Sequence, residues 1–150
     1  MSTARILLIA DDSAYRQTVL SHLHSTFRVI ESTEKSESFA AALVERPDLI
    51  VADLDLPDRI GFESIEMLRK HPSLGEIPII GLSENRKRSD VLAAVKVGVN
   101  DYLIKKETTT DSLLQKVESW LKMLNQLPAE PGEDSDTGCL TAEEAQRRRF

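Results

Sequence analysis

Short apolar runs alternate along this chain with longer segments in which apolar residues recur every three or four positions. Five runs have the length and composition of buried β-strands. They are RILLIA at 5–10, FRVIE at 27–31, DLIVAD at 48–53, IPIIGLS at 77–83 and DYLI at 101–104. Because these runs are nearly continuous rather than alternating, they predict strands buried on both faces, as in a parallel sheet.

Helices are predicted between and after these strands. The first begins at Ser13 and has a large residue every four positions through Phe27. The next three are TEKSESFAAALVER, FESIEMLRK and RSDVLAAVKVG, and Gly98 is expected to cap the last of them. Thr108 to Asp111 fits a capping box at the start of the fifth helix. The apolar stripe of that helix comprises Leu113, Val117, Trp120, Leu121 and Leu124.

Strands that alternate with helices define an α/β fold class. The rules for chain connections favour a doubly wound five-stranded parallel sheet, (βα)5 and flavodoxin-like, with strand order 2-1-3-4-5. We expect this domain to span residues 1–126. The segment 127–150 is rich in Pro, Gly and acidic residues and has little to bury. It is interpreted as a flexible acidic linker or tail.

Composition narrows the classes of partner. The net charge is −6 and the pI about 5.1, which argues against nonspecific binding of nucleic acid or anionic membranes. The single cysteine, Cys139, excludes an internal disulfide and suits a reducing cytoplasm. The N-terminal segment lacks the features of a secretory signal. No apolar run approaches about 18 residues, so no membrane span is expected.

Polar side chains recur at the C-terminal ends of the predicted strands. Asp11 and Asp12 end the first strand, Asp53 the third and Ser83 the fourth, and Lys105 follows the fifth. These ends meet at one edge of an open parallel sheet, where ligand crevices form. Each residue alone has an ordinary explanation as a cap, a turn residue or a surface charge. The ordered set predicts a shared site.

The residue types in this set are chemically complementary. Carboxylates that crowd together repel one another unless a cation lies between them, and Mg²⁺ prefers carboxylate and phosphate oxygens. A lysine and a hydroxyl beside such a metal suit the transfer of a phosphoryl group. A carboxylate nucleophile in this setting would form an acyl phosphate.

These segments resemble the receiver domain of response regulators, the CheY-like family of two-component phosphorelay signalling. The resemblance covers roughly residues 4–126 and rests on ILLIADDS, PDLIVADLDLPDRIGFE, IPIIGLS and GVNDYLIKK. Each piece is weak alone, whereas the order and spacing of all four are specific. The Asp-x-x-x-Pro spacing of the phosphoacceptor segment is kept by Asp53 and Pro57.

The resemblance implies a role for each residue of the set. Asp53 accepts the phosphoryl group, and Ser83 and Lys105 bind its oxygens. Tyr102 changes rotamer as Ser83 moves, which alters the face formed by the fourth helix, the fifth strand and the fifth helix. Mg²⁺, or Mn²⁺ in its place, is held by Asp11, Asp12, Asp53 and the backbone carbonyl of Asp55.

The resemblance also implies partners. The phosphoryl donor would be a sensor histidine kinase, a phosphotransfer protein or a small acyl phosphate. A homodimer through the switching face and a DNA-binding output domain after the linker are further expectations. Self-phosphorylation and autodephosphorylation are the only reactions implied, so the chain is not expected to be an enzyme in the ordinary sense.

The sequence departs from the family pattern near the site. Lys106 stands where many receivers have a proline with a cis bond, and because a cis non-proline bond costs about 3 kcal/mol, we expect a trans bond here. Glu84 replaces a common alanine. Asp55 adds an acid two residues after Asp53, where it could disfavour an attacking water or a phosphoryl group without metal.

Two alternatives remain open on the residues. Asp53-Leu54-Asp55 matches the Asp-x-Asp motif of haloacid-dehalogenase-like phosphatases, although in that family the motif lies near the start of the chain and an acidic pair comes last. The second alternative is a receiver fold that binds a partner without being phosphorylated. Phosphomonoester turnover would support the first, and a failure to bind beryllofluoride would support the second.

Overall fold

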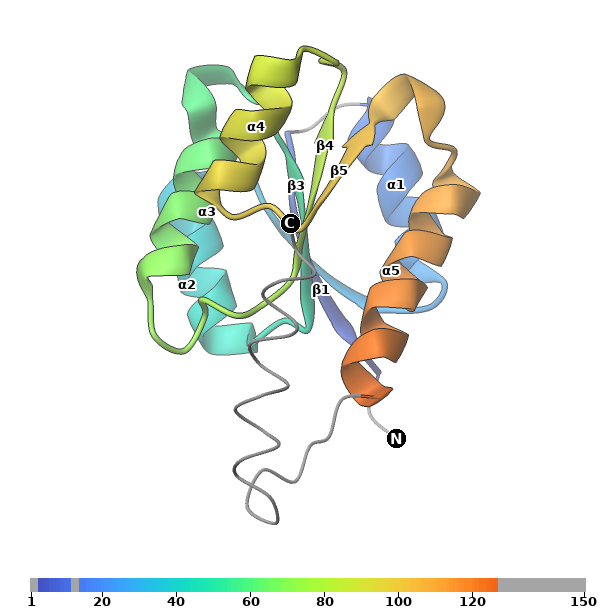
Figure 1. The fold of residues 1–150 in the computed structure, drawn as a ribbon. Coiled ribbons are helices and arrows are strands. Elements are labelled where there is room, and N and C mark those ends of the chain that lie inside the picture. Colours follow the sequence, from blue (N-terminus) through green and yellow to red (C-terminus); the bar gives the residue numbers. More distant parts are fainter. Residues whose placement is uncertain (1–2, 12–13, 127–150) are drawn as a thin grey trace.

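The computed structural model describes residues 3–11 and 14–126. Its centre is a five-stranded parallel sheet in the order β2-β1-β3-β4-β5 (Figure 1). The predicted fold class and strand order are therefore confirmed. The predicted linker 127–150 lies outside the described residues.

The strands and helices alternate along the chain as the sequence predicts. The strands are β1 (Arg5–Ile9), β2 (Arg28–Ser32), β3 (Leu49–Asp53), β4 (Ile79–Ser83) and β5 (Asp101–Ile104). The α-helices are α1 (Ala14–His24), α2 (Lys35–Glu45), α3 (Ile60–Lys70), α4 (Arg88–Val97) and α5 (Thr110–Gln126). Two short 3₁₀ turns, Pro57–Arg59 and Lys105–Glu107, follow β3 and β5.

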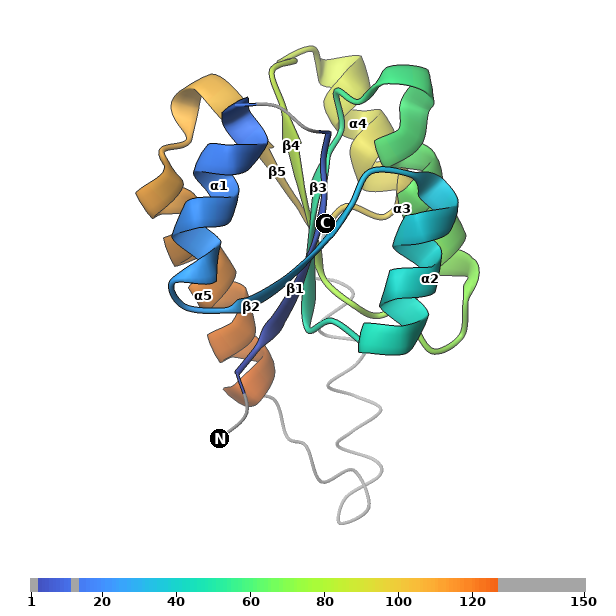
Figure 2. The ribbon, with the colours of Figure 1, turned by 180° about the vertical axis from the view of Figure 1, so that it is seen from behind.

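Helices cover both faces of the sheet. α1 and α5 pack on one face, and α2, α3 and α4 pack on the other (Figures 1 and 2). Side chains alternate between the two resulting cores, so Leu7 and Ile9 join Ile65 and Leu68 on the face of α3. Ile6 and Leu8 pack with the opposite core, which contains Val19, Leu23, Leu113 and Val117. Every residue of β3 and β4 is buried, which explains why both strands are mainly apolar up to their polar C-terminal residues, Asp53 and Ser83.

Element boundaries differ from the predictions at several helix ends. α1 ends at His24, so Phe27 lies beyond the helix, although it is buried and its N–H still donates to the carbonyl of Leu23. The cap of α5 is Thr109 rather than Thr108, because the Ser112 N–H donates to Thr109 Oγ1 at 3.0 Å. Gly98 ends α4 with φ of 124°, as predicted for a C-terminal cap.

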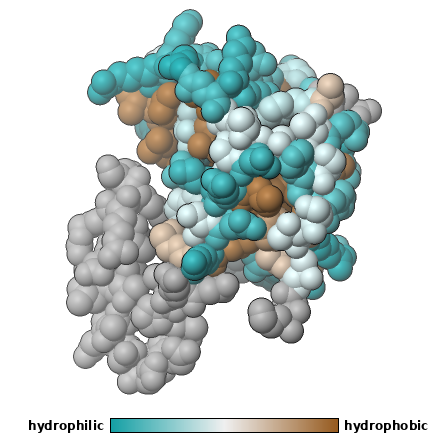
Figure 3. Space-filling view, turned by 90° about the vertical axis from the view of Figure 1, so that its right-hand side faces the viewer, coloured by the Kyte–Doolittle hydropathy of each residue, from teal (hydrophilic) through white to brown (hydrophobic). Residues whose placement is uncertain are grey.

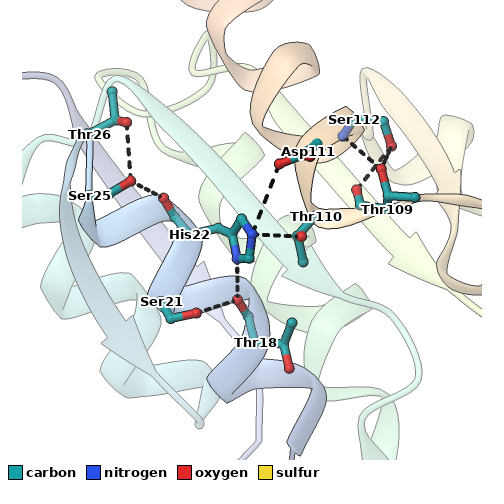
Figure 4. A network of polar contacts seen from close by, with 9 residues as sticks. All are labelled: Thr18, Ser21, His22, Ser25, Thr26, Thr109, Thr110, Asp111 and Ser112. Atoms are coloured by element: carbon teal, nitrogen blue, oxygen red, sulfur yellow. Dashed lines mark hydrogen bonds and ion pairs between the residues drawn. The ribbon is translucent and has the colours of Figure 1, made fainter.

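The contact between α1 and α5 includes a polar network around His22 (Figure 4). The Nε2 atom of this ring lies 2.9 Å from Thr110 Oγ1, and its Nδ1 atom lies 3.2 Å from the carbonyl oxygen of Thr18. Asp111 Oδ1 is 4.0 Å from the same Nε2 atom. Because the ring is engaged by both helices, this histidine has a structural role in joining them.

The outer surface on the side of α5 is mostly polar or neutral, with small apolar areas (Figure 3). Among residues 3–11 and 14–126, no helix combines the length and the hydropathy needed to cross a lipid bilayer.

Candidate functional site

The strand register brings the predicted site residues to one edge of the sheet. Ile9 of β1 pairs with Ala52 of β3, so Asp53 lies one residue past the end of this pairing. Asp53 itself pairs with Leu82, the residue before Ser83. Ser83 pairs with Ile104, the residue before Lys105. The C-terminal ends of β3, β4 and β5 therefore present a carboxylate, a hydroxyl and an ammonium side by side.

Asp53 is a buried carboxylate that is paired with Lys105. It is 5% exposed, and its Oδ1 and Oδ2 atoms lie 2.9 and 3.0 Å from the ammonium nitrogen of Lys105. The backbone N–H of Asp55 also donates to Asp53 Oδ1 at 2.8 Å. Burial raises the pKa of Asp53, and the hydrogen bonds from Lys105 and Asp55 only partly oppose this rise. The site thus contains a desolvated carboxylate that is paired with a lysine ammonium.

Lys105 is nearly enclosed and bridges two carboxylates. Its Nζ atom is 3.1 Å from Asp55 Oδ2 in addition to its contacts with Asp53. The same nitrogen lies 5.0 Å from the centre of the Tyr15 ring, which is within the range of a cation–π contact. Burial acts to lower the pKa of Lys105, but its bonds to Asp53 and Asp55 outweigh burial, so its pKa is raised. The ammonium is therefore a stable positive charge.

The side chain of Asp55 takes part in the site. The sequence analysis noted its acidity beside Asp53 but did not predict its contacts with Ser83, Glu84 and Lys105. Ser83 Oγ donates to Asp55 Oδ1 at 2.8 Å, and the Glu84 N–H donates to Asp55 Oδ2 at 2.9 Å. Burial acts to raise the pKa of Asp55, but the hydrogen bonds from Ser83, Glu84 and Lys105 together hold this pKa below its ordinary value. The charged carboxylate is the favoured form.

Ser83 is connected to Tyr102 through the loop after β4. The Asn85 N–H donates to Ser83 Oγ at 3.0 Å, and the Tyr102 hydroxyl donates to the carbonyl oxygen of Asn85 at 2.7 Å. The predicted hydroxyl and aromatic residues are thus joined by two hydrogen bonds through a residue that the sequence analysis did not single out. The only feature of the sequence that pointed to Asn85 as part of the site was its position two residues after Ser83.

The predicted metal ligands are only partly within the described residues. Asp11 is exposed and follows the end of β1, the strand beside β3. Asp12 lies outside the described residues. Within residues 3–11 and 14–126, no group of three or more His, Cys, Asp and Glu side chains is close enough to hold a metal ion. The side-chain chemistry nevertheless suits a hard cation. Asp11 follows β1 and Asp53 ends the neighbouring parallel strand β3, so both carboxylates belong to the same edge of the sheet.

The peptide bond after Lys105 is trans, as expected from Lys106 in place of proline. A 3₁₀ turn over Lys105–Glu107 follows β5 directly. Arg86, in the loop after β4, forms an ion pair with Glu107. The loops after β4 and β5 are therefore tied together beside the site.

The structure is thus a doubly wound parallel sheet with an aspartate, a hydroxyl and a lysine at the ends of three neighbouring strands. The family model described as the response regulator receiver domain matches residues 6–118. The chain belongs to the response regulator receiver family. This assignment confirms the resemblance and sets aside the haloacid-dehalogenase-like alternative.

Two curated relatives are described as a transcriptional regulatory protein and a response regulator. The chain is 36% identical over 101 residues to the KDP operon transcriptional regulatory protein KdpE of Escherichia coli, covering 67% of this chain and 44% of that protein. It is 37% identical over 87 residues to response regulator Rcp1 of Synechocystis, covering 56% of this chain and 58% of that protein. The match thus spans only about half the length of these relatives.

Solved receiver structures superpose on nearly their whole length. The Mn²⁺-bound form of Rcp1 has a TM-score of 0.67 at 29% identity, covering 84% of this chain and 99% of that one. The receiver domain of the Pseudomonas aeruginosa sensor histidine kinase PA1611, described with magnesium in its active-site cleft, has a TM-score of 0.72 at 25% identity and covers 81% and 99%. Chemotaxis response regulator CheY4 of Vibrio cholerae has a TM-score of 0.71 at 24% identity, covers 79% and 99%, and supports the fold.

Proposed function

We propose that this chain is a phosphoacceptor that receives a phosphoryl group on Asp53 and changes its surface in response. The observation that carries this proposal is the pairing of buried Asp53 with Lys105, beside the Ser83 hydroxyl. The donor would be a sensor histidine kinase, a phosphotransfer protein or a small acyl phosphate. Family membership supports a signalling role rather than turnover of a diffusible substrate.

The chemistry is a single displacement at phosphorus. An oxygen of Asp53 forms the new O–P bond while the donor's N–P or O–P bond breaks, and the electron pair remains on the donor imidazole or carboxylate. Lys105 stabilises negative charge on the transferring group, because its ammonium already lies within 3.0 Å of both Asp53 oxygens. Ser83 offers a hydroxyl donor from the adjacent strand end.

Asp11, Asp12, Asp53 and the backbone carbonyl of Asp55 would hold Mg²⁺ or Mn²⁺. A bound divalent ion neutralises charge on the transferring phosphoryl oxygens and screens neighbouring carboxylates from one another. Two similar receivers are described with Mn²⁺ or with Mg²⁺ bound, which supports this choice of metal. The residues of this chain would position the donor and the acceptor oxygen around that site.

The response would pass from Ser83 through Asn85 to Tyr102. If Ser83 moves toward the phosphoryl oxygens, its hydrogen bond with the Asn85 N–H changes and Asn85 shifts. The hydrogen bond from the Tyr102 hydroxyl to the Asn85 carbonyl oxygen then changes as well. Tyr102 lies on β5, between α4 and α5, so its rotamer would alter the α4-β5-α5 face. A second copy of the chain or an output domain would bind this face differently once it has changed. Residues 1–126 would form the receiver and 127–150 the linker to an output domain, as transcriptional relatives suggest.

Beryllofluoride, a mimic of the acyl phosphate, provides the direct test. The full chain with Mg²⁺ should bind it with one-to-one stoichiometry by calorimetry, and Asp53→Asn should abolish binding. Asp58→Asn is the matched control, because Asp58 is an exposed carboxylate in the same segment. Acetyl phosphate should also label the chain once, in a hydroxylamine-labile form that Asp53→Asn removes.

The outcomes separate the two functions that remain. Retained labelling in Asp53→Asn would place the phosphoryl group elsewhere and end the proposal. A phosphorylation-independent interaction module is favoured if the folded wild-type chain binds neither reagent and its Asp55→Asn variant does not bind either. The specific observation that favours this second function is that Ser83 and Lys105 already bond to the Asp55 carboxylate.

A further inference from the structure

Three hydrogen-bond donors of the site converge on the carboxylate of Asp55. Ser83 Oγ lies 2.8 Å from Asp55 Oδ1, while the Glu84 N–H and the Lys105 ammonium lie 2.9 and 3.1 Å from Asp55 Oδ2. These donors come from the end of β4, the residue after it and the residue after β5. The carboxylate thus accepts from a hydroxyl, an amide and an ammonium at the ends of two neighbouring strands.

A phosphoryl group on Asp53 would require the same donors. Lys105 touches both oxygens of Asp53 and one oxygen of Asp55, so a group attached to Asp53 would lie beside an ammonium that is already shared. Such a group carries roughly −1.5 to −2 charge and has three acceptor oxygens. The Asp55 carboxylate is an anion that already fills acceptor positions around Ser83 and Lys105. Both anions therefore compete for the same donors and repel each other.

We propose that the Asp55 carboxylate is an internal competitor of the phosphoryl group, which must leave Ser83, Glu84 and Lys105 before these donors can hold a phosphoryl group on Asp53. The inference rests on the proposed phosphoacceptor function and deepens it. The Asp55 side chain is 34% exposed, so it can turn into solvent without unpacking the core. In the unmodified chain the Ser83 hydroxyl donates to this carboxylate at 2.8 Å.

The test compares beryllofluoride affinities at saturating Mg²⁺. Asp55→Asn keeps the shape of the side chain and its backbone carbonyl but removes the charge, and it should tighten beryllofluoride binding by about tenfold or more. Asp55→Ala removes the acceptor oxygens as well and serves as a second variant. Asp58→Asn removes the same net charge from an exposed neighbouring position and should change the affinity by less than about twofold. Circular dichroism confirms the fold, and a separate titration establishes that Mg²⁺ saturates each variant.

A double-mutant cycle distinguishes competition for donors from a general charge effect. In a Ser83→Ala background one shared donor is absent, so the gain from Asp55→Asn should be smaller than in the wild type. Hydrogen exchange gives a readout without beryllofluoride, because the Glu84 amide should exchange faster in Asp55→Ala once its acceptor is removed.

Each outcome decides the proposal. The proposal is supported if Asp55→Asn binds beryllofluoride more tightly than the wild type and this gain in affinity is smaller in the Ser83→Ala background. It is also supported if Asp55→Asn binds beryllofluoride and the wild type does not. If the wild type binds and Asp55→Asn binds no tighter, or if its gain is unchanged in Ser83→Ala, the competition is disproved while the phosphoacceptor function stands. If no chain binds, including Asp55→Asn, both the function and the competition fail.

Discussion

The ammonium of Lys105 lies 2.9 Å from Asp53 Oδ1 and 3.1 Å from Asp55 Oδ2, so one cation joins two carboxylates that would otherwise repel. The contact also ties the end of β5 to the end of β3, although these strands are separated by β4. Lys105 therefore contributes to the stability of the domain as well as to its proposed chemistry.

Replacing Lys105 with methionine should lower the free energy of unfolding. The substitution keeps an unbranched apolar side chain one atom shorter but leaves the desolvated Asp53 carboxylate without its cation, which costs roughly 1–3 kcal/mol. Urea unfolding in EDTA measures this loss. Millimolar Mg²⁺ should reduce it, since a bound cation would screen the same carboxylates.

Lys106→Met is the matched control, because Lys106 is adjacent and exposed. It removes the same charge and should change the free energy of unfolding by no more than about 0.5 kcal/mol. Equal losses in the two variants would mean that net charge, rather than the bridge to Asp53 and Asp55, sets the effect.

Gly61 provides a second, steric connection to the site. A Cβ atom at this position would clash with the backbone carbonyl oxygen of Asp53, because the start of α3 packs directly against the end of β3. Gly61→Ala should lower the free energy of unfolding by about 1–3 kcal/mol. Alanine is favoured over glycine in a helix by about 1 kcal/mol, so a loss has to arise from the clash.

Gly75→Ala is the comparison for this prediction. The nearest atom to its added Cβ would be the carbonyl oxygen of Arg69, at 3.1 Å, which a small backbone shift can relieve. We expect a smaller loss in urea unfolding than for Gly61→Ala, and unchanged beryllofluoride binding. A reversed order of the two losses would show that the packing of α3 against Asp53 is not tight.

The fold was predictable because its signals are local, whereas part of the site depends on tertiary contacts. The apolar runs that became β3 and β4 are buried along their full length, and Asp53, Ser83 and Lys105 follow from where strands end. The contacts of the Asp55 side chain with Ser83, Glu84 and Lys105 could not be read in this way. Asp55 and Ser83 are 28 residues apart, and their hydrogen bond depends on the conformation of both loops.

Tyr15 shows a similar limit of sequence reasoning. Its spacing with Val19 and Leu23 predicts a place on the buried face of a helix, and its ring does adjoin that core. The same ring also faces the ammonium of Lys105, a residue 90 positions away, which no periodicity could indicate. A residue on an apolar stripe can thus have a second contact at the site.

Tyr15 should ionise late in an alkaline titration. Burial raises its pKa above the ordinary value of 10.0, with Lys105 opposing the shift and Asp53 and Asp55 adding to it. The phenolate absorbance of the two tyrosines, Tyr15 and Tyr102, should therefore include a component that titrates above pH 10 and is absent in Tyr15→Phe.

The same shift links Tyr15 to stability. Its pKa is higher in the folded chain than in the unfolded chain, so its contribution is fully present below pH 10 and is lost as the pH rises through the folded pKa. As the pH rises above 10, the wild type should therefore lose more unfolding free energy than Tyr15→Phe. Parallel pH profiles for the two chains would contradict the raised pKa.

The α4-β5-α5 face should mediate dimerisation when the site is occupied. Leu92 on α4 is 54% exposed, and burying it against a second copy would favour association. Light scattering should show a larger mass with Mg²⁺ and beryllofluoride, and Leu92→Asp should prevent the increase. Val44→Asp is the control, because Val44 is 77% exposed on α2, away from this face. An unchanged mass would count against the dimer, and equal loss in both variants would place the interface elsewhere.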